Sequence, residues 1–471
     1  MGNRWHPRYQ EPSSAPTALP LTEVAVLALV LWLGCSPAVP EPRVEVAPAP
    51  ADLATVPDDA PPARPRRLRA RPEPEPEIGL WNDKREPSAE TIAQLEALGY
   101  IGGETAGTGL AGVTVNDPAR VQPGLNLWTS GHGPEAHLMD ASGTVVHTWR
   151  RSFAESYPGR AFDPSKNGTQ FWRRVALLPD GHLLVVFEGQ GLVHLDRDSN
   201  VVWAWSGLAH HDLEVLDDGR ILVLSRRAHL IPRLHPRRPV LEDFVSLLSP
   251  EGEELRRVSV LEAIEQSPFA SLWQADAKRY GDVFHTNAVE RLDGSLADRL
   301  PEFTAGRVLV SSRALHAIAV IDLDTGRAVW GTKGDFARQH DPHLLPGGRI
   351  LLFDNLGQRD RSSVIELDPL TGVIGWSWGR SPEQPLFSRF CGAATRLGNG
   401  NTLITESGNG RALEVTTDGE VVWEFHNPNR AGPEGQFVAI LPEVTRVSRA
   451  DVPWLEQTPP PDRPDPAGAT P

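Results

Sequence analysis

The 471-residue sequence is poor in cysteine, lysine and tyrosine, and each shortage excludes a class of protein. Two cysteines, Cys35 and Cys391, are too few for a disulfide framework, and no closely spaced cysteine pair is present to bind zinc. Four lysines accompany 42 arginines, and the net charge of −15 argues against nucleic-acid binding. An apolar content of 40% is nevertheless sufficient for a large folded core.

Long hydrophobic runs are also scarce. One apolar stretch stands out, from Val24 to Cys35. It is shorter than the roughly 18 residues of a membrane-spanning helix, and Arg4 and Arg8 precede it. A small residue, Gly34, stands before the cysteine, as at a bacterial lipoprotein cleavage site. We therefore predict a signal segment over 1–35 with lipid attachment at Cys35. A plain signal peptide and a single anchoring helix are the alternatives. All three predict export to the periplasm or cell surface, and we expect the protein to be anchored to the membrane.

Low-complexity segments flank the centre of the chain. Residues 36–84 are predicted to be a proline-rich disordered linker, since 12 prolines lie within 36–77. The segment 85–112 is predicted to hold a short helix, capped by Ser88, and a further linker. The tail 449–471 is again predicted to be disordered.

The region 113–448 contains a repeat of apolar strands, a glycine turn, and an Asp-centred turn before a strand that ends in an aromatic residue. Copies of this Asp-turn phrase begin at Asp140, Asp196, Ser249, Asp322, Asp368 and Asp418. Their spacing of roughly 45–75 residues is typical of four-stranded propeller blades. We predict an all-β fold, a six-bladed β-propeller closed by the C-terminal strand Phe437 to Leu441; a seven-bladed count is the alternative.

A histidine-led phrase opens several of these units. His211 and His340 each lie eight residues before a turn glycine, Gly219 and Gly348. Equivalent positions of different blades face one axis in a closed ring, so the imidazoles are predicted to form a cluster there. The same alignment places Arg173 and Gly392 at this level, and adds His285, Asn287 and Arg313 from the fourth blade. His210 and His343 are adjacent, but strand alternation predicts that their side chains face the other way.

This set of side chains favours an anion over a metal ion. Three imidazoles can bind zinc or copper, but a nearby arginine repels cations, so no metal site is predicted. Arginine, asparagine and protonated histidine together suit a tetrahedral oxyanion. A neutral histidine also offers a nucleophilic nitrogen, which favours group transfer through a covalent histidine intermediate.

The chain resembles the bacterial arylsulfotransferase family over about 120–447. The similarity lies in His211-Asp212, Phe284-His285-Thr286-Asn287, Ser311-Ser312-Arg313, Gln339-His340-Asp341 and Leu352-Phe353-Asp354-Asn355. The resemblance implies a six-bladed propeller that transfers a sulfuryl group from an aryl sulfate to a phenolic acceptor, with ping-pong kinetics and without a cofactor.

The resemblance also implies a role for each matching residue. His340 would attack sulfur, while His211, His285, Asn287 and Arg313 would hold the sulfate oxygens. One histidine would protonate the leaving phenolate, and the sequence does not say which. The remaining substrate contacts are expected from Arg173, Trp172, Phe284 and His343.

Two alternatives remain open at this point. A non-catalytic propeller at the cell surface would bind a ligand or partner in the same channel. A sulfate-ester hydrolase would use the same site, with water in place of the phenol. A quinoprotein-like dehydrogenase is disfavoured because the adjacent cysteine pair it would need is missing.

Overall fold

The computed structural model describes residues 105–160, 167–273, 279–358 and 360–456, together with 88, 91–92 and 102–103. The signal segment, the linker 36–84 and the tail beyond 456 lie outside these residues, so their assignments stay predictions. The predicted disordered tail begins too early at 449, because residues 449–456 form two 3₁₀ turns and Trp454 packs into the core, 3% exposed. Ser88 caps a helical turn as expected, because the Thr91 amide donates to its Oγ at 3.1 Å. None of the helices in the described residues has the length and hydropathy of a membrane span.

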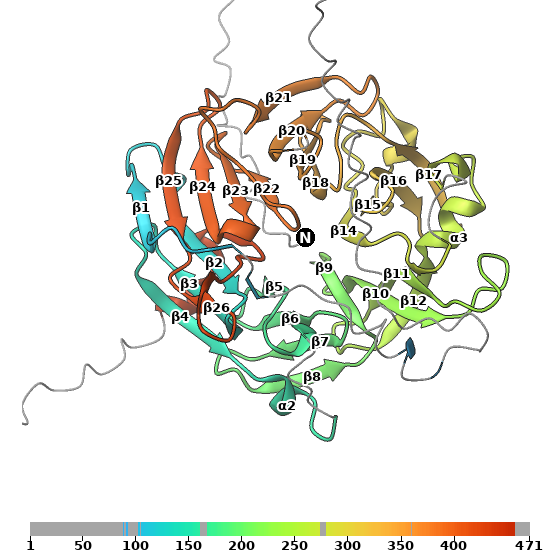
Figure 1. The fold of residues 1–471 in the computed structure, drawn as a ribbon, viewed down its shortest axis with the longest axis horizontal. Helices are drawn as coiled ribbons and strands as arrows, with labels where there is room; N and C mark the ends of the chain where they lie inside the picture. Colours follow the sequence, from blue (N-terminus) through green and yellow to red (C-terminus); the bar gives the residue numbers. More distant parts are fainter. Residues whose placement is uncertain are drawn as a thin grey trace, which may run out of the picture. The chain divides into compact units, whose positions relative to one another are not determined.

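Six sheets surround a common centre, which confirms the all-β, six-bladed prediction (Figure 1). Blade 1 contains β28 (Val444–Val447), β2 (Leu125–Ser130), β3 (Gly133–Met139) and β4 (Val145–Arg150). Blade 2 contains β5 (Arg174–Leu177), β6 (Leu183–Phe187), β7 (Gly191–Leu195) and β8 (Val201–Trp205). Blade 3 contains β9 (Ala209–Val215), β10 (Ile221–His229), β11 (Val240–Leu248) and β12 (Glu254–Ser259), with β13 (Gly281–Asp282) parallel to β11.

The other three blades follow in chain order. Blade 4 contains β14 (Thr286–Arg291), β15 (Val308–Ser312), β16 (Ala317–Asp322) and β17 (Arg327–Thr332). Blade 5 contains β18 (His340–Leu344), β19 (Ile350–Asp354), β20 (Ser363–Leu367) and β21 (Ile374–Trp378). Blade 6 contains β22 (Ala393–Arg396), β23 (Thr402–Glu406), β24 (Arg411–Val415), β25 (Val421–His426) and the outermost β1 (Gly112–Asn116).

Short elements fill the connections. The helices are α2 (Phe153–Ser156) and α3 (Val260–Glu265), and a two-stranded hairpin joins β26 (Arg430–Ala431) to β27 (Phe437–Val438). Single 3₁₀ turns occupy Asn167–Thr169, Ala270–Leu272, Pro301–Phe303, Ser407–Asn409, Arg449–Asp451 and Pro453–Glu456.

A C-terminal strand closes the ring, but it is not the one predicted. β28 pairs with β2 from Leu125 opposite Val447 to Trp128 opposite Val444. The predicted strand, Phe437 to Leu441, instead bonds to the segment before blade 1: the Val438 amide donates to the Thr105 carbonyl, and the Ile440 amide to the Gly102 carbonyl. This segment is apolar because most of it is buried by this packing, and an apolar segment of this length has the composition of a blade strand.

The tryptophans of the outer strands join neighbouring blades, as their position in the repeat predicts. Trp149 of blade 1 donates to the Gly181 carbonyl of blade 2, at 3.2 Å. Trp378 of blade 5 reaches Gly419 of blade 6 at 3.1 Å, and Trp423 of blade 6 reaches back to Ala141 of blade 1 at 2.9 Å. Each ring therefore fills an inter-blade space while its N–H is satisfied.

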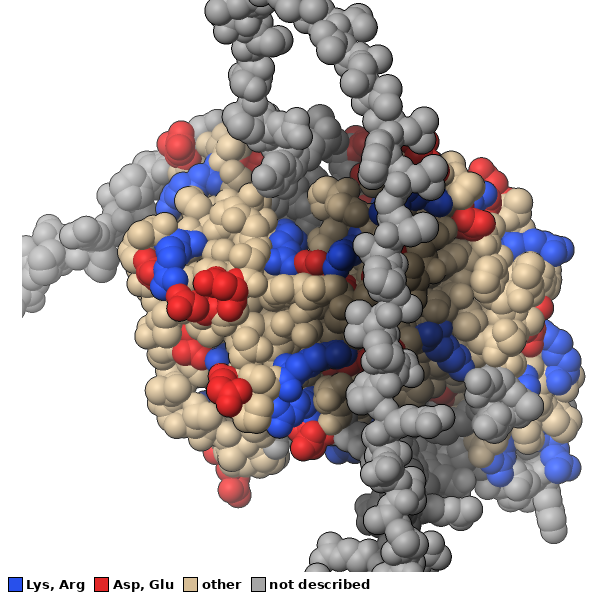
Figure 2. All heavy atoms as spheres, turned by 90° about the horizontal axis from the view of Figure 1, so that it is seen from above, with Lys and Arg blue, Asp and Glu red and all other residues tan. Residues whose placement is uncertain are grey.

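Charges on the surface are mixed. On the face in Figure 2, acidic and basic side chains are interspersed among uncharged ones. The charges that matter most for architecture are buried. Arg446 of β28 is 4% exposed, and its Nη2 lies 2.9 Å from the Glu414 carboxylate of β24, while its Nε donates to Asn126 of β2. This buried pair holds the closing strand against both blade 1 and blade 6.

We expect Arg446→Met to lower the free energy of unfolding by about 3–5 kcal/mol, because it leaves the Glu414 charge buried without its partner. The measurement is urea unfolding followed by tryptophan fluorescence. Arg256→Met is the control: its pair with Asp324 is exposed, at 40% and 96%, and its loss is expected to cost less than about 1 kcal/mol. Equal costs for the two variants would contradict a special role for closure.

Candidate active site

The inner strands begin with a left-handed residue at the site. His211 and His285 have φ of 54° and 50°, and in blade 5 the residue after the histidine, Asp341, has φ of 53°. Side-chain alternation fails at such a residue, because the left-handed conformation re-aims the chain. The prediction that His210 faces away from His211 is therefore wrong: their Nδ1 atoms lie 2.8 Å apart. A strained backbone of this kind costs about 1–3 kcal/mol and marks a functional site more often than a plain strand.

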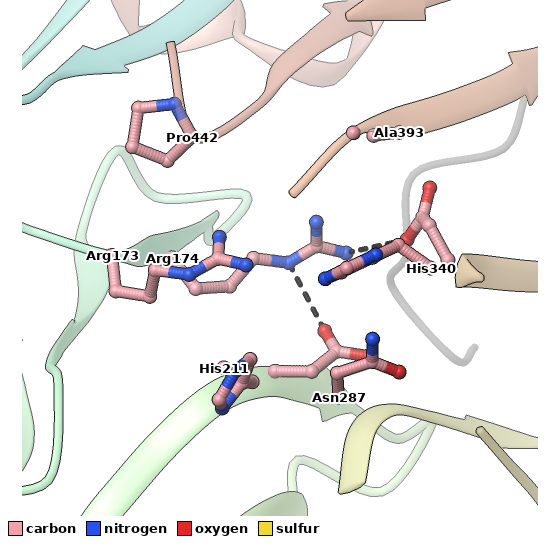
Figure 3. Close-up of a pocket in the computed structure, with 10 residues that line it drawn as sticks. Arg173, Arg174, His211, Asn287, His340, Ala393 and Pro442 are labelled. Atoms are coloured by element: carbon pink, nitrogen blue, oxygen red, sulfur yellow. Dashed lines mark ion pairs between the residues drawn. The ribbon is translucent and has the colours of Figure 1, made fainter. Parts of the chain in front are cut away.

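A cavity lies at the centre of the ring, and its roughly 250 Å³ of atom-free space includes space that is open to solvent. Its lining residues come from all six blades: Arg173, Arg174, His211, Asp212, Asn287, His340, Asp341, Gly392, Ala393 and Pro442. In Figure 3, the side chains of Arg173 and Arg174 reach into the space between His211 and His340. The structure thus brings together Arg173, His211, Asn287 and His340, as the alignment by turn glycines predicts.

His340 is held as a neutral imidazole with one nitrogen available. Burial and then the positive charge of Arg313 keep the pKa of His340 well below its usual range. Its Nδ1 lies 2.7 Å from Oδ1 of Asn355. The amide of Asn355 donates to the carbonyls of Ser388 and Cys391, at 2.8 and 2.6 Å, so its oxygen must face the imidazole. The proton is consequently on Nδ1, and Nε2 keeps its lone pair.

His211 lies in a second buried group with His210 and Glu188. Burial, followed by the charges of His285 and His210, keeps the pKa of His211 well below its usual value. The Glu188 carboxylate accepts the backbone N–H of His211 at 2.9 Å. The spacing of these three side chains would suit a metal ion. However, Arg226 Nη1 lies 3.4 Å from Glu188 Oε1, and this positive charge disfavours a cation there.

His285 is distinguished from the other two histidines by a carboxylate partner. Its Nδ1 makes a short hydrogen bond with Asp282 Oδ2, and its ring packs edge-on against His211 with centroids 4.9 Å apart. Burial opposes ionisation of Asp282, but the His285 charge and hydrogen bond outweigh it and hold the pKa of this carboxyl below its usual range. Burial and the Asp282 charge raise the pKa of the neighbouring Asp243 to about 8. One proton is therefore retained by this carboxyl pair on the Asp243 side.

Several buried polar atoms in this region have no hydrogen-bond partner. Among them are Nε2 of His340, Oδ1 of Asn287 and Nε of Arg313, together with Oδ1 of Asp282 and Oε1 of Gln339. Leaving such an atom unsatisfied costs about 1–3 kcal/mol, so their grouping indicates the position of a polar ligand. Asn287 is itself fixed, because its Nδ2 donates to the Gln339 carbonyl at 2.8 Å. Gln339 in turn donates to Ser311 and to the Ala317 carbonyl, which ties blade 5 to blade 4 behind the site.

Five residues predicted to contact substrate are not among those that line the cavity: Trp172, Phe284, His343, His285 and Arg313. Trp172 is fully buried in a hydrophobic cluster, and Phe284 stacks on Trp273 with centroids 4.5 Å apart. The ring of His343 lies 3.0 Å from the Asp341 carboxylate, away from the cavity wall. The packing therefore gives Trp172 and Phe284 a core role in place of the aromatic substrate contact predicted for them.

The central region of the chain matches a known family. A family model described as arylsulfotransferase (ASST) matches residues 174–428, more than half of the chain. The chain belongs to the arylsulfotransferase family. Membership supports sulfotransfer as the broad activity, and the match includes His211, His285, Asn287, Arg313 and His340.

Solved structures similar to this arylsulfotransferase-family chain have low sequence identity. A Bacteroides caccae protein of unknown function is 14% identical, covering 69% of this chain and 99% of its own, with a TM-score of 0.45. The Dos1 propeller is 12% identical, covering 66% and 75%, with a TM-score of 0.36. A virginiamycin B lyase from Staphylococcus aureus is 10% identical, covering 56% and 71%, with a TM-score of 0.34. No curated protein matches the chain.

Several members of the site were missed or left without a role by the sequence reasoning. Asn355 stood in a recognised phrase but had no assigned function. Asp282 precedes His285 by three residues, and a carboxylate so close to a candidate histidine is a usable signal. Arg174 received no role because the alignment by turn glycines selected its neighbour Arg173. Glu188 directly follows β6 and has no motif around it, so only the closed ring reveals its contact with His211.

We expect the protein to lose stability as the pH falls below about 6.5. Burial lowers the pKa of His210, His211 and His340, so the unfolded chain binds protons that the folded chain does not. The free energy of unfolding should therefore fall by about 1.4 kcal/mol per pH unit for each imidazole. Asp243 opposes this, since its raised pKa lets the folded state keep a proton up to about pH 8. In the described residues, seven imidazoles with lowered pKa values outnumber four carboxyls with raised ones (Asp243, Asp354, Glu406 and Asp451), so acid destabilises overall.

The measurement is the urea midpoint at about pH 7.5 and about pH 5.5, with a lower midpoint expected at the acidic pH. His210→Gln should reduce the difference, because it removes one of these imidazoles. A midpoint that is unchanged or higher at the acidic pH would contradict the burial of neutral histidines.

Proposed function

We propose that the protein transfers a sulfuryl group from an aryl sulfate to a phenolic acceptor through a covalent intermediate on His340. The observation that carries the proposal is the free Nε2 of His340, a neutral, buried imidazole nitrogen without a hydrogen-bond partner. Family membership supports sulfotransfer in general. The identity of the nucleophile, the donor and the acceptor is our proposal.

In the first half-reaction, the Nε2 lone pair of His340 forms a bond to sulfur as the bond from sulfur to the aryl oxygen breaks. The leaving oxygen takes a proton and departs as a phenol. The sulfo-imidazolium keeps its proton on Nδ1, and this N–H still donates a hydrogen bond to Asn355 Oδ1. In the second half-reaction the acceptor phenol loses its proton, its oxygen bonds to sulfur, and the N–S bond breaks. His340 returns to its starting tautomer.

Positive charge near the nucleophile supports this chemistry. Arg313 and Arg173 are both close enough to His340 to lower its pKa. The same guanidinium groups would stabilise the charge on the sulfuryl oxygens, as fixed donors do in phosphoryl transfer. No charge needs to be moved into the site during the reaction, because the donors are already in place.

We assign the acid–base step to His285. Its Nδ1 is engaged by Asp282, which leaves Nε2 to exchange a proton with the aryl oxygen. The side chain of His285 is 18% exposed, whereas His211 and His340 are 3% and 2% exposed as residues. A proton can therefore reach His285 from solvent between the two half-reactions.

Incubation with a chromogenic aryl sulfate should add one sulfuryl group to the wild-type protein, and none to His340→Ala. The measurement is intact-mass spectrometry, followed by peptide mapping under mildly alkaline conditions that preserve an N-sulfo bond. His137→Ala, a histidine of β3 outside the cavity, is the control and should still be labelled.

Phenol release without any adduct, from a folded wild-type sample, would oppose the covalent step. Turnover of the adduct in water alone, at the rate seen with phenol, would instead identify a hydrolase. Neither release nor adduct would favour a binding propeller.

Asn355→Leu should slow the formation of the adduct by at least about 10-fold, because the proton of His340 is no longer held on Nδ1. Asn355→Asp should restore the tautomer but raise the pKa of His340, through its new negative charge. Its rate of adduct formation should therefore recover only at alkaline pH, where His340 is neutral. The measurement is the single-turnover rate as a function of pH; equal rates for Leu and wild type would exclude Asn355 from this role.

A further inference from the structure

Arg174 is surrounded by carboxylates from across the ring. It is 8% exposed, and each of its three guanidinium nitrogens faces a different acid. Its Nε lies 3.0 Å from Asp212, its Nη2 lies 3.7 Å from Asp341, and its Nη1 makes a short contact with Glu443. Two of these ion pairs are drawn in Figure 3, which shows them bordering the cavity. Three buried carboxylates therefore share one positive charge.

The four groups come from four blades. Arg174 begins β5 of blade 2, Asp212 lies in β9 of blade 3, Asp341 lies in β18 of blade 5, and Glu443 directly precedes β28 of blade 1. Blades 2 and 5 are on opposite sides of a six-membered ring, so the contacts of Arg174 cross the centre. The tryptophan hydrogen bonds described above join neighbouring blades, whereas the ion pair of Arg174 with Asp341 joins blades on opposite sides of the ring.

Two of the carboxylates adjoin the proposed catalytic histidines. Asp212 follows His211, and Asp341 follows His340. Each is also bonded to the next blade: Asp212 accepts the Val289 amide at 2.8 Å, and Asp341 accepts the Ala394 amide at 3.2 Å. Moving either carboxylate would thus move the backbone of a histidine and of the neighbouring inner strand.

We propose that Arg174 is a positioning residue that fixes the distance between His211 and His340 by holding Asp212 and Asp341 across the channel. This inference rests on the proposed function, since it assigns a role within the same reaction. Arg174 lines the cavity, but its guanidinium is already engaged by carboxylates on every nitrogen. Sulfate is therefore better served by Arg173 and Arg313, and Arg174 acts through the histidines.

The test is Arg174→Lys in the full-length protein, with saturating and subsaturating aryl sulfate. Lysine keeps the positive charge but cannot contact three carboxylates at fixed angles. A small displacement of reacting groups costs up to about 100-fold, so we expect kcat and the single-turnover rate of adduct formation to fall about 10–100-fold. KM should change less than about 2-fold, because the charge near the substrate is retained.

The matched control is Arg446→Lys, which also shortens a buried guanidinium with a carboxylate partner, but away from the cavity. It should keep the wild-type kcat. Equal losses in the two variants would overturn the proposal in favour of general destabilisation. A rise in KM at constant kcat would overturn it in favour of substrate binding by Arg174, and a wild-type kcat in Arg174→Lys would overturn it directly.

A second variant covers the case in which Arg174→Lys does not fold. Glu443→Gln keeps the shape of its side chain but removes the charge that anchors Arg174 on the blade 1 side. A kcat at least about 3-fold lower at unchanged KM is expected, as with any loosened near-attack geometry. A wild-type kcat in a folded Glu443→Gln protein would overturn the proposal. Failure of the wild type itself to form an adduct would instead refute the covalent function, with no bearing on these contacts as structure.

Discussion

The pairing of β28 with β2 is the constraint on which the site depends. Arg174, His211, His285 and His340 are separated by tens of residues in the chain, and no local turn could bring them together. They meet because the ring closes and each inner strand begins at the same level around it. Closure also removes the open sheet edges that would otherwise promote association with other chains. Closure of the ring therefore stabilises the fold and also brings the site residues together.

Burial acts on the site in two opposing ways. It removes water from three imidazoles and so favours their neutral, nucleophilic form, with Arg313 and Arg173 adding to the effect at His340. It also makes every unpaired charge costly, and carboxylates partner Arg174 and Arg226. The unpartnered atoms of His340, Asn287 and Arg313 are among the exceptions. The cost of these unpartnered atoms is offset by the strands behind the site, which are almost fully buried and hydrogen-bonded within their sheets.

Much of the architecture was predictable because propeller blades repeat. Period-two strands, Asp-centred turns and outer-strand tryptophans recur often enough to give the blade number and the level at which Arg173, His211 and His340 meet. The closing strand was misassigned because Phe437 to Leu441 has the apolar composition of a blade strand, and hydrogen-bond partners cannot be read from composition. The orientation of the His210 side chain was predicted wrongly for a different reason. The left-handed φ of His211 breaks the alternation of side chains that a regular strand would have. Glu188 and the cross-channel role of Arg174 depend on contacts between blades, which only the closed ring defines.

The three histidines differ because their neighbours differ. An amide oxygen next to His340 can only accept a hydrogen bond, so it fixes a tautomer without adding charge, and the ring stays neutral. A carboxylate next to His285 does add a negative charge, and it forms a hydrogen bond with Nδ1 of that ring. His211 faces another imidazole and the carboxylate of Glu188, whose charge is shared with Arg226. In the proposed reaction, His340 is the nucleophile, His285 the acid–base group and His211 a contact of the sulfate oxygens. The partners Asn355, Asp282 and Glu188 distinguish the three histidines from one another. These differences cannot be predicted from the histidines alone.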